Sequence, residues 1–308
     1  MITNVLSVDV EEYYHAAIFR SGTTGFSSQF ESRVERSVER LLGLMSDHSA
    51  KGTFFVLGEI ADRHPWSVRR IAGEGHEIAC HGDRHDDVHR LSSEEFRADI
   101  RCAKARIEDA IGDSVIGYRA PNFSIGRDQT WAYEILLEEG FRYDSSTYPI
   151  LHDRYGQFTA PRFPYEIWRA GSTSLVEFPI GTARLLGVNL PIGGGGYFRL
   201  LPVTVVSRGI RRVNARERQP VMFYMHPWEL DPGQPRPQMP WRHRFRHRIG
   251  LEKEEVKLSS LFAQFQFGTA RAALALRGQL GGSPAVTLAP SCQPILSSSR
   301  RQSPELSV

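Results

Sequence analysis

Two histidines lie four residues apart in the sequence HGDRH, which runs from His81 to His85. They directly follow the apolar run Ile78 to Cys80, which has the composition of a buried strand. If the intervening residues form one turn, both imidazoles point to the same side and can bind one divalent metal. The same spacing also occurs on solvated helix faces, so the pair alone leaves both interpretations open.

Carboxylates that could complete a metal site occur in the amino-terminal stretch NVLSVDVEE, residues 4–12. Side chains alternate along a strand, so the apolar residues share one face while Ser7, Asp9 and Glu11 share the other. Two carboxylates therefore project together near the carboxyl end of the strand, which a bound cation or a shared proton makes tolerable. The alternative is an edge strand whose polar face turns into water.

Three further segments place polar residues directly after a short apolar run. They are Arg119-Ala120-Pro121, Tyr143-Asp144-Ser145-Ser146 and Phe223-Tyr224-Met225-His226-Pro227-Trp228. The ordered set D-x-E, HxxxH, RxP, DSS and a late strand-terminal His resembles the polysaccharide deacetylase family, the NodB-homology or carbohydrate esterase family 4 group. The resemblance runs from about Thr3 to Pro232. Each motif alone is weakly specific, but the five in this order are highly specific.

Helical and extended patterns alternate along the chain, which is typical of a mainly parallel sheet with outer helices. Helices are predicted over Phe30 to Met45, Ala61 to Gly73 and Glu94 to Ile111, the last with a capping box of Ser92 and Glu95, and a buried strand over Gly52 to Leu57. Further helix and strand signals lie at Thr130 to Glu139, Leu175 to Ile180, Val203 to Val213 and Val221 to Met225. The family resemblance sharpens this α/β pattern to a distorted (β/α)7 barrel, in which functional groups gather at the carboxyl ends of the strands.

The resemblance implies an amide hydrolase that uses a divalent metal. His81 and His85 would bind the metal together with one amino-terminal carboxylate, and zinc is the expected ion. A metal held in this way polarises the substrate carbonyl and lowers the pKa of a bound water.

The resemblance also assigns roles to four residues that would carry the reaction. Asp9 would be the base that removes the water proton, and His226 would be the acid that protonates the departing amine. Arg119 would hold the Asp9 carboxylate. Asp144 would orient an active-site group, either His226 or Arg119.

The first motif departs from the family pattern. Most members read TFDD, with adjacent aspartates as base and metal ligand, whereas this chain reads SVDVEE and has Val10 at the ligand position. Strand geometry favours Glu11 as the ligand, because it lies on the same face as Asp9. Glu12 is the alternative if the strand ends early and the chain turns.

Composition indicates one domain over residues 1–280 and a disordered tail over residues 281–308, which is poor in apolar residues. The formal charge of +3 is small for 308 residues and gives no reason to expect a nucleic acid partner. Three scattered cysteines do not indicate a disulfide framework. The sequence shows neither a signal-peptide pattern nor an apolar stretch of about 20 residues, so we expect a cytoplasmic protein.

The expected substrate is an N-acetylhexosamine unit of an exopolysaccharide or of its lipid-linked precursor at the inner face of the membrane. This expectation rests on GGGGYFR, residues 193–199, and HPWELDP, residues 226–232, which resemble the subgroup associated with exosortase-linked exopolysaccharide clusters. A basic cluster is either a solvated face or a contact for an anionic glycan or lipid-linked pyrophosphate, with peripheral membrane association. Its members are Arg236, Arg242, His243, Arg244, Arg246, His247 and Arg248.

Two other functions stay open. One is a metal-independent amidohydrolase on the same scaffold, against which the retention of His81 and His85 argues. The other is a non-catalytic glycan-binding protein with a decayed site, against which the retention of Arg119 and His226 argues. Metal content separates the first alternative from a metalloenzyme, and acetate release separates the second.

Smaller features support smaller expectations. Trp228 and Tyr197 would either stack on sugar rings or pack in the core. The glycines at 193–196 would let the backbone approach a glycan closely or form a plain turn. The isolated histidines are expected to be structural or solvated; they are His15, His76, His89 and His152.

Overall fold

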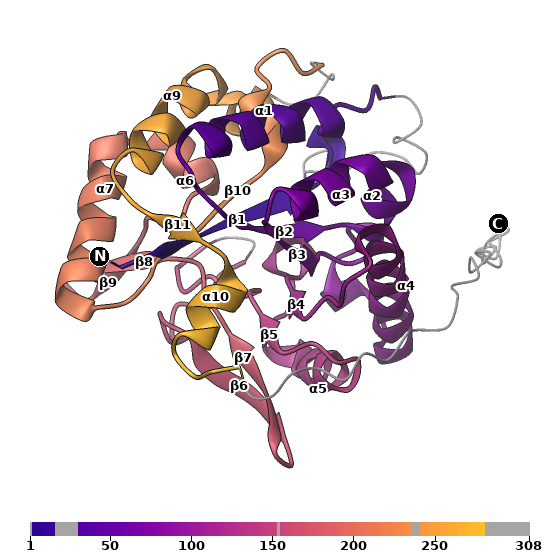
Figure 1. Ribbon diagram of the computed structural model, residues 1–308. Coiled ribbons are helices and arrows are strands. Elements are labelled where there is room, and N and C mark those ends of the chain that lie inside the picture. The colour runs from indigo at the N-terminus through magenta and orange to yellow at the C-terminus, as the bar shows by residue number, and fades with distance from the viewer. Residues whose placement is uncertain (1, 16–29, 153–154, 236–240, 281–308) are drawn as a thin grey trace, which may run out of the picture.

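A mainly parallel sheet forms the centre of the protein in the computed structural model, which describes residues 2–15, 30–152, 155–235 and 241–280 (Figure 1). In spatial order its strands are β10 (Met222–Met225), β1 (Asn4–Val10), β2 (Thr53–Val56), β3 (Glu77–Cys80), β4 (Gly117–Tyr118), β5 (Tyr143–Asp144), β7 (Thr173–Glu177) and β6 (Tyr165–Ala170). Only β6 runs antiparallel to its neighbour in this order, and β11 (Phe267–Gly268) pairs with β1 as an additional parallel strand. A separate hairpin consists of β8 (Thr182–Leu185) and β9 (Val188–Pro191).

The strand ladder does not close between β7 and β10, and the chain segments on either side of the β8–β9 hairpin fill this seam. Gly181 donates a backbone hydrogen bond to Met222 and Gly193 accepts one from Tyr224, at 2.9 and 2.7 Å. The distorted (β/α)7 barrel is thus confirmed in the order and direction of its parallel strands, but its wall is completed by irregular chain.

The glycine tract runs along β10 at this seam. Gly194 has a φ of 99°, and a Cβ atom there would lie 1.9 Å from the carbonyl oxygen of Tyr224. Only glycine tolerates both the backbone conformation and this close approach. The tract therefore serves strand packing, where the sequence had suggested an approach to a glycan or a plain turn.

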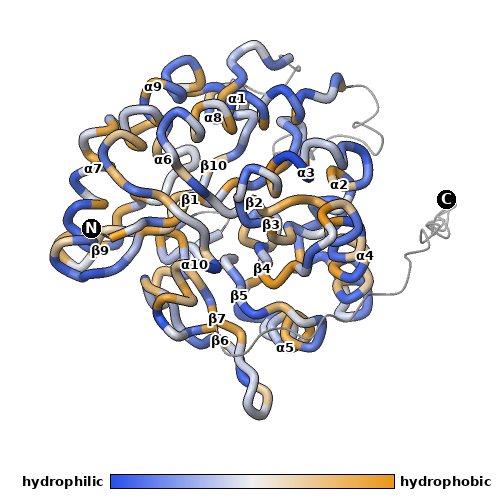
Figure 2. The backbone as a smooth tube through the Cα atoms, viewed as in Figure 1, coloured by the Kyte–Doolittle hydropathy of each residue, from blue (hydrophilic) through white to orange (hydrophobic). Residues whose placement is uncertain are grey.

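Helices surround the sheet, and Figure 2 shows apolar residues concentrated along the central strands. The helices are α1 (Val34–Asp47), α2 (Gly58–Arg63), α3 (Pro65–Gly73), α4 (Ser93–Ile111), α5 (Trp131–Glu138), α6 (Gly195–Leu200), α7 (Val203–Arg212), α8 (Trp241–Arg248), α9 (Leu251–Phe262) and α10 (Ala270–Ala275). The predicted capping box is present on α4, where Ser92 and Glu95 exchange side-chain to backbone hydrogen bonds. The single helix predicted over Ala61 to Gly73 is wrong, because Pro65 interrupts it and begins α3.

Two apolar layers follow from the alternation of side chains along β1. Leu6 and Val8 pack on the outer side of the sheet against the helices, in one large core cluster. Val5 packs on the inner side with Phe55 and Tyr143, in a second cluster that fills the barrel. The inner face also carries Ser7 and Asp9, so strand alternation delivers polar side chains to the barrel interior as predicted.

Three further predictions concern the ends and the surface of the chain. The tail over residues 281–308 and Cys292 lie outside the described residues, and no disulfide joins Cys80 and Cys102. Within the described part of the chain, every helix is too short or too polar to cross a membrane.

Candidate active site

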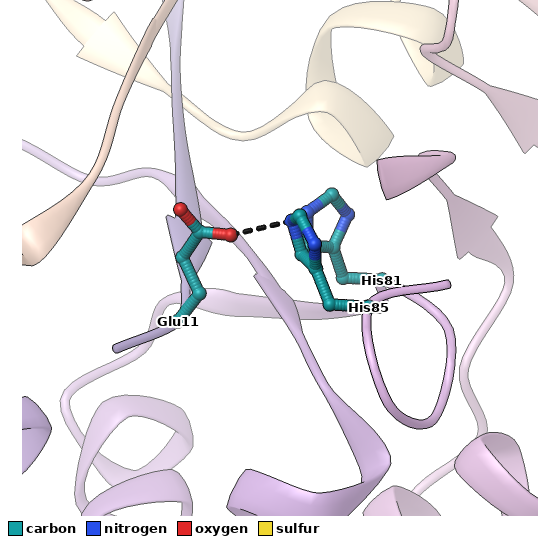
Figure 3. Close-up of side chains that lie close together, drawn as sticks. All are labelled: Glu11, His81 and His85. Atoms are coloured by element: carbon teal, nitrogen blue, oxygen red, sulfur yellow. Dashed lines mark ion pairs between the residues drawn. The ribbon is translucent and has the colours of Figure 1, made fainter. Parts of the chain in front are cut away.

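Side chains that follow several strands converge at one end of the sheet. Glu11 follows β1, His81 follows β3, and His85 lies four residues further along the same loop. All three are almost completely buried, with exposed fractions of 3%, 1% and 2%. Figure 3 shows the Glu11 carboxylate facing the two imidazoles, and one potential ligand atom from each residue lies within 4.8 Å of the others.

The Glu11 carboxylate is ionised in this setting. Burial alone would raise its pKa, but the nearby His85 and His226 rings outweigh burial and hold the pKa of Glu11 well below its usual range. Oε2 of Glu11 lies 2.6 Å from Nε2 of His85. Oε1 accepts a 3.1 Å hydrogen bond from the Trp228 indole and lies 3.5 Å from Nε2 of His226.

His81 offers a free ring nitrogen to the site. Its Nδ1 lies 2.8 Å from the carbonyl oxygen of Arg119. A carbonyl oxygen can only accept a hydrogen bond, so Nδ1 carries the proton and Nε2 has a lone pair that can bind a metal. Burial lowers the pKa of His81 to about 4, which keeps the ring neutral. A neutral, oriented imidazole is the form that binds a metal.

The loop between the two histidines is irregular and not the helical turn considered from the sequence. Gly82 and His85 both have positive φ, at 80° and 63°. The carboxylate of Asp99 on α4 accepts a hydrogen bond from the backbone of Asp83 at 3.1 Å and holds the loop in place. The His85 ring stacks on His15 at 5.8 Å between centroids, so His15 has a structural contact, one of the two roles expected of the isolated histidines.

One carboxylate and two imidazoles form a donor set that suits zinc. The buried atoms Oε2 of Glu11 and Nδ1 of His85 have no conventional hydrogen-bond partner among the described residues, although Oε2 closely approaches the His85 ring. Buried polar groups rarely lack partners, and a cation beside Glu11 would compensate its charge. The residues present therefore fit a divalent metal.

Glu12 points away from these residues and has a different partner. Its carboxylate accepts hydrogen bonds from the Ser32 hydroxyl and from the backbone N–H of Arg33, the latter at 3.0 Å. Arg33 directly precedes α1, so Glu12 neutralises the positive end of that helix. Of the two candidate carboxylates, the structure brings Glu11 to the histidines.

Arg119 and Asp9 form a buried ion pair beside the histidines. Nη1 of Arg119 donates to Oδ1 of Asp9 at 2.6 Å, while Nη2 donates to the hydroxyls of Ser7 and Ser145 at 2.9 Å. The guanidinium lies over the Phe55 ring at 4.1 Å. The second Asp9 oxygen lies 3.9 Å from Nε2 of His81, so the carboxylate is fixed at the edge of the candidate metal site.

Glu229 is a candidate functional residue that sequence reasoning missed. Its Oε2 accepts the backbone N–H of His226 at 3.0 Å and lies 3.7 Å from Nδ1 of the same residue. Its Oε1 lies 2.9 Å from Nε of Arg199 on α6. The acid three residues after His226, in the motif HPWE, was a signal for this contact, because a short turn brings residues i and i+3 together.

The surroundings of His226 favour its charged form. Burial alone lowers its pKa, but the charges of Glu11 and Glu229, followed by that of Asp9, outweigh burial and raise the pKa of His226 to about 9. His226 therefore carries a proton at neutral pH that it can donate.

Trp228 is held between two histidine rings. The His226 and His247 rings stack on it at 5.0 and 4.7 Å. Only 6% of Trp228 is exposed, so it packs in the core and is not available to a sugar ring. His247 belongs to the predicted basic cluster but is buried here, while Arg236 and the side chains of His243 and Arg244 lie outside what the structure describes.

Asp144 does not contact the groups that it was expected to orient. Within the described residues its carboxylate accepts a hydrogen bond from the hydroxyl of Ser146 at 2.6 Å, and burial beside Glu177 raises the pKa of Asp144. Burial and the Asp144 charge raise the pKa of Glu177 well above its usual range, which favours the protonated form of Glu177. Asp144 reaches Arg119 only indirectly, because Ser146 accepts the backbone N–H of Ala120.

Comparisons with known proteins match this sequence in two parts. Residues 26–136 match the family model "Polysaccharide deacetylase", and residues 145–275 match a domain of unknown function, DUF3473. A peptidoglycan-N-acetylglucosamine deacetylase of Bacillus cereus is 33% identical over 96 residues, which are 31% of this chain and 35% of that protein. A chitooligosaccharide deacetylase of Rhizobium leguminosarum bv. trifolii is 39% identical over 62 residues, which are 20% of this chain and 29% of that protein. The matched regions thus span about a third of these relatives.

Solved structures show the same fold. A protein of Mycobacterium smegmatis assigned as a polysaccharide deacetylase superposes with a TM-score of 0.57 at 21% identity, covering 95% of this chain and 94% of its own. The PuuE allantoinase superposes with a TM-score of 0.58 at 17% identity, covering 88% of each chain. The matching family model leads to one assignment: residues 26–136 form part of a polysaccharide deacetylase domain, which is followed by a DUF3473 region.

Proposed function

We propose that this protein is a metal-dependent hydrolase that removes N-acetyl groups from N-acetylhexosamine units of a glycan. The observation that carries the proposal is the convergence of Glu11, His81 and His85 beside Asp9 and His226. Curated relatives named as peptidoglycan-N-acetylglucosamine and chitooligosaccharide deacetylases support the substrate class.

Each residue has a distinct task in the proposed reaction. The chemistry supplied by a divalent ion bound to Glu11, His81 and His85 is polarisation of the amide carbonyl and acidification of water. Asp9 accepts the proton of the attacking water, and Arg119 keeps its carboxylate oriented. His226 donates its proton to the nitrogen of the departing amine, so that acetate and a free amino group result.

The substrate that we propose is an exopolysaccharide or its lipid-linked precursor, handled at the cytoplasmic face of the membrane. This narrower assignment rests on the resemblance of residues 193–199 and 226–232 to the exosortase-associated subgroup. Free amino groups on the secreted polymer should disappear when the gene is deleted. Unchanged acetylation of the polymer in the deletion strain would remove the support for this substrate, and fractionation of cells would test the location.

The decisive experiment combines metal analysis with acetate release by the full-length protein. We expect one divalent ion per chain and acetate release from chitooligosaccharides or lipid-linked N-acetylhexosamine, lost with a chelator and restored by zinc. His89→Ala is the matched control for His81→Ala, since His89 lies in the same segment but is exposed. Acetate release that resists the chelator would favour a metal-independent amidohydrolase, and glycan binding without release would favour a non-catalytic protein.

A further inference from the structure

The β8–β9 hairpin carries an apolar face that becomes more exposed towards its tip. Ala183 pairs with Leu190 and Leu185 pairs with Val188, which places these four side chains on one face of the hairpin. Their exposed fractions rise from 4% at Ala183 to 39% at Leu190 and to 48% and 49% at Leu185 and Val188. At the tip, Leu186 is 96% exposed. The face therefore begins in the core and ends in solvent.

The residue at the tip is unfavourable for the turn that it forms. Leu186 and Gly187 both have positive φ, at 50° and 82°. Two-residue hairpin turns of this kind favour Asn, Asp or Gly at both positions, because a branched apolar side chain is strained there. An exposed leucine in this conformation stabilises neither the turn nor the core. Its presence is explained if the tip contacts an apolar environment outside the protein.

Arginines lie on β8 and on the elements that pack beside the base of the hairpin. Arg162 donates to the carbonyl oxygen of Thr182 at 2.6 Å and pairs with Glu217 at 2.6 Å, which fixes the base of β8 to the turn after α7. α7 itself packs beside β8 (Figure 1). Exposed arginines on β8, on α7 and on the turn after it are Arg184, Arg208, Arg211, Arg212, Arg216 and Arg218.

We propose that the β8–β9 hairpin docks the protein onto an anionic lipid bilayer. Leu186 and its apolar neighbours would enter the boundary between headgroups and acyl chains, and the arginines would contact the anionic headgroups. A second copy of the chain is a poorer partner, because a two-fold interface would bring the same cations together. A hairpin tip also buries far less than the roughly 1,200 Å² of a standard stable interface. This surface is independent of the proposed deacetylase activity.

The test is sedimentation of the full-length protein with vesicles of phosphatidylglycerol and phosphatidylethanolamine, compared with vesicles of phosphatidylcholine alone. We expect binding to the anionic vesicles that weakens with salt. Leu186→Asn should reduce the binding constant by about tenfold or more, since one leucine side chain leaves the apolar boundary. The same variant should melt at or above the wild-type temperature, because asparagine tolerates positive φ.

Matched variants separate the hairpin from the rest of the surface. Leu276→Asn removes another leucine, 86% exposed and distant in sequence, and should leave vesicle binding unchanged. Arg216→Gln should weaken binding to anionic vesicles, whereas Arg277→Gln, also at an exposed arginine, should not. Equal binding by the wild type and Leu186→Asn would overturn the proposal, as would absence of binding. Dimerisation that depends on Leu186 without vesicle binding would assign the surface to a second copy instead and equally overturn it.

Discussion

Nη1 of Arg119 lies 2.6 Å from Oδ1 of Asp9, although the two residues are 110 positions apart in the chain. Both are buried, with exposed fractions of 0% and 3%. A buried ion pair of this kind contributes little net stability over an apolar alternative, but removing one partner leaves an uncompensated charge. We therefore interpret the ion pair as a contact that positions the Asp9 carboxylate and adds little to the stability of the fold.

Arg119→Ala should lower the free energy of unfolding by about 3 to 5 kcal/mol, because it strands the Asp9 charge in the interior. Arg119→Lys should recover part of this loss but little activity, since one ammonium group cannot serve Asp9, Ser7 and Ser145 in the geometry of a planar guanidinium. Chemical denaturation of the two variants measures the effect. An alanine variant as stable as the wild type would contradict it.

Asp9→Asn and His226→Ala should each lower kcat by about 10² to 10⁴, the usual contribution of a general base or acid. Both variants should still bind metal, because neither side chain belongs to the group of Glu11, His81 and His85. The readout is acetate release together with metal content and melting temperature. Full activity in either variant would refute the role assigned to that residue.

Glu11→Ala and Glu12→Ala should differ in their effects on metal content and on stability. Glu11→Ala should lose stoichiometric metal, because its carboxylate faces both histidines. Glu12→Ala should keep metal but lower stability by about 1 kcal/mol, the typical value of a lost contact at a helix amino terminus. Elemental analysis and thermal melting of the purified variants decide the matter. If Glu12→Ala lost metal and Glu11→Ala kept it, Glu12 would be the metal ligand and the assignment of Glu11 would be wrong.

Glu229→Gln should lower kcat by about tenfold to a hundredfold with little change in KM, since the glutamate positions the His226 ring without reaching the substrate. Glu254→Gln is the matched control. Glu254 is fully buried, and burial followed by the Glu229 charge raises its pKa to about 9, so it is already neutral at pH 7. The control should keep its kcat. If both variants lost kcat in proportion to their loss of stability, Glu229 would have only a structural role.

His76 should make stability depend on pH between about 6.5 and 4. Burial, with the charge of Lys51, lowers its pKa to about 4, and its Nδ1 accepts the backbone N–H of Gly52 at 3.2 Å. Since the folded-state pKa is depressed, the stabilisation is complete above the unfolded value near 6.5 and is lost as pH falls through about 4. We expect His76→Gln to remove about 1 to 2 kcal/mol of this pH dependence, allowing for solvent screening. If the free energy of unfolding changed with pH in the same way in the wild type and in His76→Gln, the prediction would be wrong.

Features that depend on neighbouring residues could be read from the sequence, and those that depend on tertiary contacts could not. Alternation along β1 correctly placed Ser7 and Asp9 on one face, where both contact Arg119, whereas Glu11 lies beyond the end of the strand. The Ser92 and Glu95 capping box correctly placed the start of α4 to within one residue. Pro65 also acts locally, because a proline cannot continue the helix predicted over Ala61 to Gly73 and begins α3 instead.

The contacts of the site residues could not be predicted from the neighbouring sequence, because their partners are distant in the chain. Asp144 was expected beside Arg119 or His226, but it lies next to Glu177 of the adjacent β7. The pairing between β5 and β7 cannot be predicted from either strand alone. Arg199 likewise meets Glu229 only because α6 folds back over the end of β10. The choice between Glu11 and Glu12 required the position of α1, whose first turn occupies Glu12.

The seam between β7 and β10 divides the barrel wall into a stiff and a compliant part. Continuous pairing of β1, β2 and β3 holds the segments that carry Glu11 and His81, so their separation resists distortion. Across the seam, isolated contacts such as that from Gly181 to Met222 replace a ladder, and such contacts open at lower free energy than paired strands. We therefore expect the barrel wall to yield first at this seam, while the spacing of the histidines and their carboxylate stays fixed.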